Sequence, residues 1–125
     1  MLRSDGVWCR PRPGKWSALE YGCHVRDVFR IMDSRLVKML TLDDPPFANW
    51  DQDKTAVADR YEGQDPGDVL TELEAAALTL ADRYESVSED QWDRPGTRSN
   101  GSRFTVATLG IYCMHDVHHH LWDVS

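Results

Sequence analysis

Four of the five histidines of this chain lie between residues 115 and 120, and the fifth is His24. His115 and His119 are four residues apart, a spacing that places two imidazoles on one face of an α-helix, about 6 Å apart along its axis. Neutral imidazole is a good ligand for Zn²⁺, Ni²⁺ or Fe²⁺. The two rings could therefore bind one divalent metal ion, with His24 as the candidate third ligand.

Three protein ligands would leave at least one coordination position for water or substrate, as in catalytic zinc sites. A metal-bound water can ionise near neutral pH, and a metal ion can also hold a thiolate. An isolated pair of histidines four residues apart is a weak signal, however, and a single histidine beside an apolar stripe is commonly a hydrogen-bonded core residue. Spacing alone leaves both interpretations open, and no general base can be named.

The helix that would carry His24 has a well-marked start. Ser17 and Glu20 form the pattern of a capping box, in which the hydroxyl caps free amides and the carboxylate reaches back. Apolar residues then recur at spacings of three and four as far as Met39. This periodicity predicts a long helix that begins at Ser17, ends near Leu40 and places His24 beside its apolar stripe.

The remaining elements must bring His115 and His119 to that helix. Prolines at 45 and 46 end the first helix, and a long connection follows over residues 43–53. Asp65 and Pro66 are typical of a helix start. We expect further helical segments at 54–61, 65–84, 88–92 and 105–122, and a loop at 95–101.

No segment alternates between apolar and polar residues with a period of two, and the pattern therefore predicts an all-α antiparallel bundle. On a helical wheel, Thr108, Ile111, Tyr112 and Trp122 share the side of His115 and His119, and Cys113 lies about 160° from His115. Tyr112 is interpreted as a core aromatic, although its hydroxyl could meet a substrate.

Length and composition favour one folded domain over residues 1–125, with an irregular segment at 1–16 that contains two prolines and two glycines. The chain is 41% hydrophobic and 28% charged, with a formal net charge of −7. The acidic balance argues against a nucleic-acid partner. No apolar run is long enough to span a membrane and no signal-peptide core is present, which predicts a cytoplasmic protein. The three cysteines contain no CxxC pair, so a disulfide framework is not expected.

Two motifs at opposite ends of the chain resemble those of the DinB-like superfamily. The stretch WSALEYGCHVRD, from Trp16 to Asp27, is similar to the family segment W-[ST]-x-x-E-x-x-x-H-[LV]-x-[DH]. The ending HDVHHHLWD, from His115 to Asp123, looks like the terminal HxxxH helix of the family. The superfamily includes the YfiT-type hydrolases and the mycothiol-dependent maleylpyruvate isomerases, whose N-terminal domain is of this type.

The resemblance implies a four-helix bundle in which three histidines hold a divalent metal ion. Carried onto this chain, the ligands are His24, His115 and His119, and zinc is favoured, with nickel and iron as alternatives. The implied function is that of a metal-dependent enzyme, a hydrolase or a thiol-dependent transferase or isomerase. Its partners would be a small-molecule substrate and a low-molecular-weight thiol. The alternative function is a non-catalytic helical bundle for binding or dimerisation.

One departure from the family pattern concerns the start of the chain. Relatives begin with a long helix before the tryptophan-containing loop, whereas this sequence starts inside that loop. We therefore expect three long helices, an absent first helix and an apolar groove that is left uncovered. Either the chain is a truncated form or a second subunit covers that groove, and the second alternative predicts a homodimer.

Five other residues near the motifs are most simply interpreted as structural. Cys113 is expected to pack in the core, while the role of Cys23 stays open. Glu20 is expected to be the acid of the capping box, with a contact to a metal ligand as the alternative. Asp116 and Asp123 are expected on a solvated face.

Overall fold

The computed structural model describes residues 17–99 and 101–124, and for residues 116–124 it describes the backbone alone. Three long helices dominate it: α1 (Ala18–Thr41), α3 (Pro66–Glu85) and α4 (Val106–Val124). A short helix α2 (Gln52–Ala58) and two single 3₁₀ turns, η1 (Tyr61–Gly63) and η2 (Glu89–Gln91), lie in the connections. The predicted mainly helical bundle with three long helices is confirmed, while the predicted irregular segment 1–16 lies outside the described residues.

The first helix starts as its sequence predicts. The backbone amide of Glu20 donates to Ser17 Oγ at 3.2 Å, and the amide of Ser17 donates to Glu20 Oε1 at 3.1 Å. Both residues are buried, so this capping box satisfies two backbone amides inside the protein at the start of α1. The predicted cap of the third helix is also present, because Asp65 accepts from the amide of Asp68.

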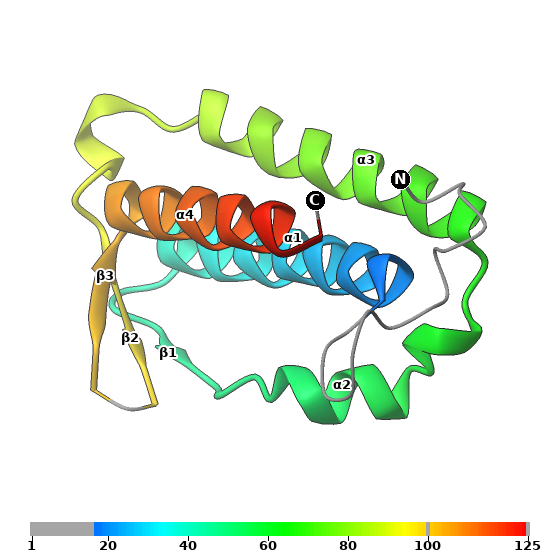
Figure 1. Cartoon of the computed structure of the whole chain (residues 1–125). Coiled ribbons are helices and arrows are strands. Elements are labelled where there is room, and N and C mark those ends of the chain that lie inside the picture. Colours follow the sequence, from blue (N-terminus) through cyan, green and yellow to red (C-terminus); the bar gives the residue numbers. More distant parts are fainter. Residues whose placement is uncertain (1–16, 100, 125) are drawn as a thin grey trace.

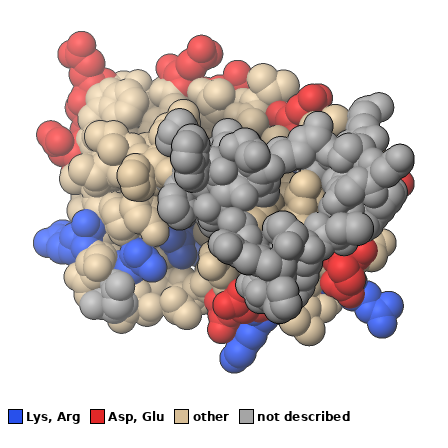
Figure 2. All heavy atoms as spheres, in the orientation of Figure 1, with Lys and Arg blue, Asp and Glu red and all other residues tan. Residues whose placement is uncertain are grey.

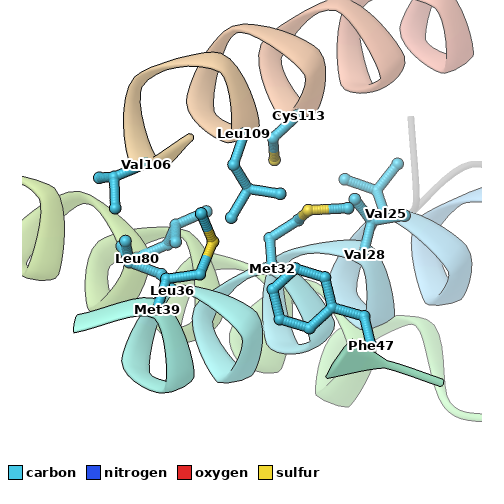
Figure 3. Close-up of a cluster of buried hydrophobic side chains, with 10 residues drawn as sticks. All are labelled: Val25, Val28, Met32, Leu36, Met39, Phe47, Leu80, Val106, Leu109 and Cys113. Atoms are coloured by element: carbon cyan, nitrogen blue, oxygen red, sulfur yellow. The ribbon is translucent and has the colours of Figure 1, made fainter. Parts of the chain in front are cut away.

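Helix α1 is the centre of the bundle and packs against both α3 and α4 (Figure 1). The close-up of the main core shows that α4 runs antiparallel to α1 (Figure 3). Val106, at the start of α4, lies over Leu36 and Met39, whereas Cys113 lies near Val25 and Val28. The part of α4 that follows Cys113 is therefore level with the first turns of α1.

A small sheet closes the end of the bundle where α1 finishes and α4 begins (Figure 1). It consists of β1 (Pro46–Phe47), β2 (Pro95–Arg98) and β3 (Arg103–Thr105), with β1 parallel and β3 antiparallel to the central β2. The prediction of a loop at 95–101 was wrong, because strands of two to four residues are too short to display an alternating pattern. The position of Gly96 shows how closely β1 and β2 pack, since a Cβ there would lie 2.5 Å from the Phe47 ring.

An apolar groove of about 650 Å³ lies between α3 and α4, as the sequence leads one to expect. Its walls include Leu80 and Tyr84 of α3, and Ile111 and Met114 of α4. Ile111 and Met114 are 70% and 67% exposed, so the groove is open to solvent along the α4 side. None of the described helices is both long and apolar enough to cross a membrane.

Candidate metal centre

His24 is buried on α1, with 1% of its surface exposed. Its ring stacks on the indole of Trp50, with centroids 5.4 Å apart and planes 4° from parallel. Trp50 is itself fixed, because its Nε1 donates to Thr55 Oγ1 in α2 at 2.8 Å. The connection between β1 and α2 thus sets the plane of the imidazole, which is how proteins orient a metal ligand.

His115 lies on the exposed side of α4, two residues after the buried Cys113. The antiparallel packing of α1 and α4 places the turn from His115 to His119 at the level of the early turns of α1, where His24 lies. The side chain of His119 is outside the described residues, so the three-histidine set stays a prediction. Within the described part of the chain, no three His, Cys, Asp or Glu residues cluster tightly enough to hold a metal ion.

The described residues on the predicted histidine side of α4 are exposed. The stripe that faces the core consists of Val106, Leu109 and Cys113, as the wheel position of Cys113 predicts. The prediction that Tyr112 is a core aromatic was wrong, because Tyr112 lies on the side of α4 that is turned away from that stripe. Tyr112 is 41% exposed and packs on Phe104, with ring centroids 5.5 Å apart.

A buried ionic cluster that no pattern in the sequence predicts lies on another face of α1. Arg26 Nε donates to Asp27 Oδ1 at 3.0 Å, and its Nη1 donates to Gln64 at 2.6 Å and to Glu72 at 3.0 Å. The hydroxyl of Tyr61 donates to Asp27 in a short hydrogen bond. These contacts tie α1 to η1 and α3. Their residues are far apart in sequence, so no local signal could have revealed the cluster.

The two cysteines in the described chain are both core residues. Cys113 belongs to the main core, as predicted. Cys23 is fully buried beside the carbonyl of Tyr61, and burial raises the pKa of its thiol to about 12. A buried thiol that stays protonated is a poor nucleophile, so the question that the sequence left open is answered in favour of packing. Glu20 is the capping-box acid, as predicted.

The available donors fit a divalent metal ion of the zinc type. Imidazole is a preferred ligand of Zn²⁺, and His24 presents an imidazole whose orientation is already set by Trp50. A buried ligand on α1 and a water-exposed partner on α4 would leave one side of the ion accessible. The structure thus shows a helical bundle in which one predicted metal ligand, His24, is buried and oriented on α1.

The chain belongs to the DinB superfamily, whose family model matches residues 4–124. The fold is similar to that of YfiT from Bacillus subtilis, with a TM-score of 0.82 at 20% sequence identity. The likeness covers 92% of this chain but 66% of the other, so this chain spans less than two thirds of that protein. YfiT is described as a probable metal-dependent hydrolase with an unusual four-helix bundle topology. A comparison with curated protein sequences finds no match.

Proposed function

We propose that this protein is a metal-dependent enzyme whose divalent metal ion is held by His24, His115 and His119. The observation that carries the proposal is the buried imidazole of His24, oriented by Trp50 and level with the histidine turn of α4. Membership of the DinB superfamily and the description of YfiT as metal-dependent support it. Zinc is the favoured ion, because imidazole ligands in a site with an open position suit it well.

The chain's own residues would bind and orient the reactants. His24 is fixed on its buried side by the indole of Trp50, while His115 lies at the solvent-exposed surface, where a small molecule has access. A bound divalent ion supplies Lewis-acid chemistry: it polarises a substrate oxygen, activates a water, or holds a thiolate. We therefore propose hydrolysis, or transfer or isomerisation that uses a low-molecular-weight thiol, in a cytoplasmic setting.

Metal analysis tests the site directly. Protein purified without a histidine tag should contain about one divalent ion per chain, and His24→Ala or His119→Ala should lower that content at least ten-fold, since each removes a ligand. His118→Ala and His120→Ala are the matched controls, because they remove a neighbouring imidazole outside the proposed set. Equal metal content in all four variants, or a folded wild type that binds no metal when it is supplied, would reject the proposal.

Activity follows from the same proteins. Esters, amides and thiol adducts should be screened with the metal-loaded wild type, and any turnover should disappear in His119→Ala and survive in His118→Ala. Turnover of esters or amides without added thiol would identify a hydrolase, whereas a requirement for thiol would identify a transferase or isomerase.

The uncovered groove favours a second candidate function, in which the bundle binds a copy of itself. Ile111 and Met114 of α4 are exposed at the edge of a groove that is lined almost entirely by apolar side chains. Apolar surface of this kind is common at protein interfaces. Sedimentation should show a homodimer that Met114→Glu converts to a monomer while circular dichroism is unchanged. A folded wild type that is monomeric at all concentrations would exclude this candidate.

A further inference from the structure

A second pocket, of about 240 Å³, lies between α1 and the segment that connects β1 to α2. Arg35 and Lys38 of α1 form one wall, and Phe47, Asn49 and Trp50 contribute to the other. The face of Trp50 thus serves two sites, because its indole lines this pocket and also stacks on His24.

Positive charge is concentrated around this pocket. The guanidinium of Arg35 lies over the ring of Phe47, 5.3 Å from its centroid, and Arg98 is the register partner of Phe47 in the parallel pair of β1 and β2. The two guanidinium groups are close enough to repel each other, and burial together with Arg98 lowers the pKa of Arg35. In Figure 2, basic side chains gather on the side of the molecule where the small sheet lies, although the chain as a whole is acidic.

These cations are not neutralised within the described residues. No carboxylate there forms an ion pair with Arg35, Lys38 or Arg98, whereas the neighbouring Arg103 pairs with Asp44 at 3.4 Å. Among the described residues, Arg35 donates one hydrogen bond, from Nη2 to the carbonyl of Ala48, at 3.4 Å. The guanidinium is therefore oriented by its surroundings and keeps donors for an anion, which it can bind in a bidentate manner.

The pocket and the candidate metal centre share Trp50 and lie along one face of α1. His24, Ile31 and Arg35 follow one another at spacings of seven and four residues, so they form a single stripe of the helix. Arg35 lies about 16 Å from His24 along the helix axis, and its long side chain shortens the gap that a ligand must span. On the α4 side, Tyr112 lies near Arg35 and three residues before His115.

We propose that Arg35, with Arg98 and Lys38, binds the carboxylate or phosphate group of a small anionic substrate whose other end reaches the histidines. That the anion belongs to the substrate rests on the function proposed above. The binding of the anion does not, because it needs only the cations of the pocket.

Titration with inorganic phosphate and, separately, with malonate tests the pocket at constant ionic strength. The readout is the NMR signal of the Trp50 indole N–H, assigned by its loss in Trp50→Phe. In wild type, we expect the indole N–H signal to shift saturably with at least one of the two anions. In Arg35→Gln, the dissociation constant for that anion should be at least about ten-fold larger. Lys54→Gln, which removes the same charge from an exposed position on α2, is the matched control and should bind like wild type.

Each arm has a defined outcome. A shift that is absent for both anions, or that persists unchanged in Arg35→Gln, overturns the inference. If Arg35→Gln does not fold, Arg98→Gln should still weaken binding about three-fold, and its failure to do so counts against the pocket.

The titrations are repeated after EDTA treatment. If anion binding is lost when the metal is removed, the anion is a ligand of the metal and the inference is overturned. If the protein binds no metal under any condition but still binds the anion through Arg35, the proposed metal-dependent function is rejected and the anion pocket is retained.

Discussion

Two faces of helix α1 bury polar side chains for opposite purposes. On one face, which we call the closed face, Arg26 forms ion pairs with Asp27 and Glu72, and Asp27 also accepts a hydrogen bond from Tyr61. On the other face, His24 is oriented by an aromatic stack, and Arg35 is oriented by Phe47 with no carboxylate paired to it among the described residues.

The difference distinguishes polar side chains that stabilise the fold from those proposed to bind a ligand. An ion pair that is completed within the fold holds elements together and has no need of a ligand. His24 and Arg35, which are oriented by aromatic rings, are the side chains to which we assign the proposed metal ion and anion. Burial of a polar residue is thus informative about function only when its partners are considered with it.

The largest expected effect is the loss of stability when the ion pairs of the closed face are disrupted. Asp27→Ala removes the buried carboxylate that pairs with Arg26, which is 4% exposed, and that accepts from the Tyr61 hydroxyl. We expect the free energy of unfolding in urea to fall by about 3 kcal/mol, because Arg26 keeps only the half-exposed Glu72 and Gln64 as partners and the buried Tyr61 hydroxyl loses its acceptor. Asp82→Ala, at an exposed site on α3, should change it by less than about 0.5 kcal/mol. Similar values for the two variants would show that the cluster is not structural.

A second change sharpens the comparison on the histidine face. Trp50→Leu keeps an apolar side chain but removes the flat surface that orients His24. Loss of such support around a ligand typically weakens metal binding about ten-fold or more, and we expect that result in a chelator competition assay. Trp92→Leu alters an indole that packs on Tyr84, outside both sites, and should leave metal affinity unchanged. Equal affinity for wild type and Trp50→Leu would remove the proposed role of the stack.

The third expected effect, which is smallest because it is absent near neutral pH, is a pH dependence of stability that arises at Cys23, beside Tyr61. Burial raises the pKa of the Cys23 thiol from 9.0 to about 12. The unfolded chain therefore releases a proton between about pH 9 and pH 12 while the folded chain retains it, and the free energy of unfolding falls as pH rises through that window.

Cys23→Ala should make this decline shallower, by at most about 1.4 kcal/mol per pH unit. A part of the decline above pH 10 should persist, because burial raises the pKa of Tyr84 from 10.0 to about 12. The slope is the readout, since the substitution also leaves a small cavity that lowers stability at every pH. Unfolding curves with equal slopes for the two proteins would contradict the burial of the thiol.

Local signals in the sequence determined the three long helices and the N-terminal caps of two of them. Ser17 with Glu20 and Asp65 with Pro66 mark helix starts because capping depends on residues within three positions of each other. The apolar periodicity of α1 likewise predicted which side would meet the core, and the two motifs at the chain ends predicted the family. Such features need no knowledge of the rest of the chain.

Contacts between distant segments were decided only by the tertiary structure. The pairing of β1 with β2 joins residues about fifty positions apart, and the cluster around Arg26 draws on α1, η1 and α3. The stack of Trp50 on His24 and the placement of Arg98 beside Arg35 are of the same kind. Each depends on how helices and strands pack in space, because side chains that meet through packing carry no mark of one another in the sequence.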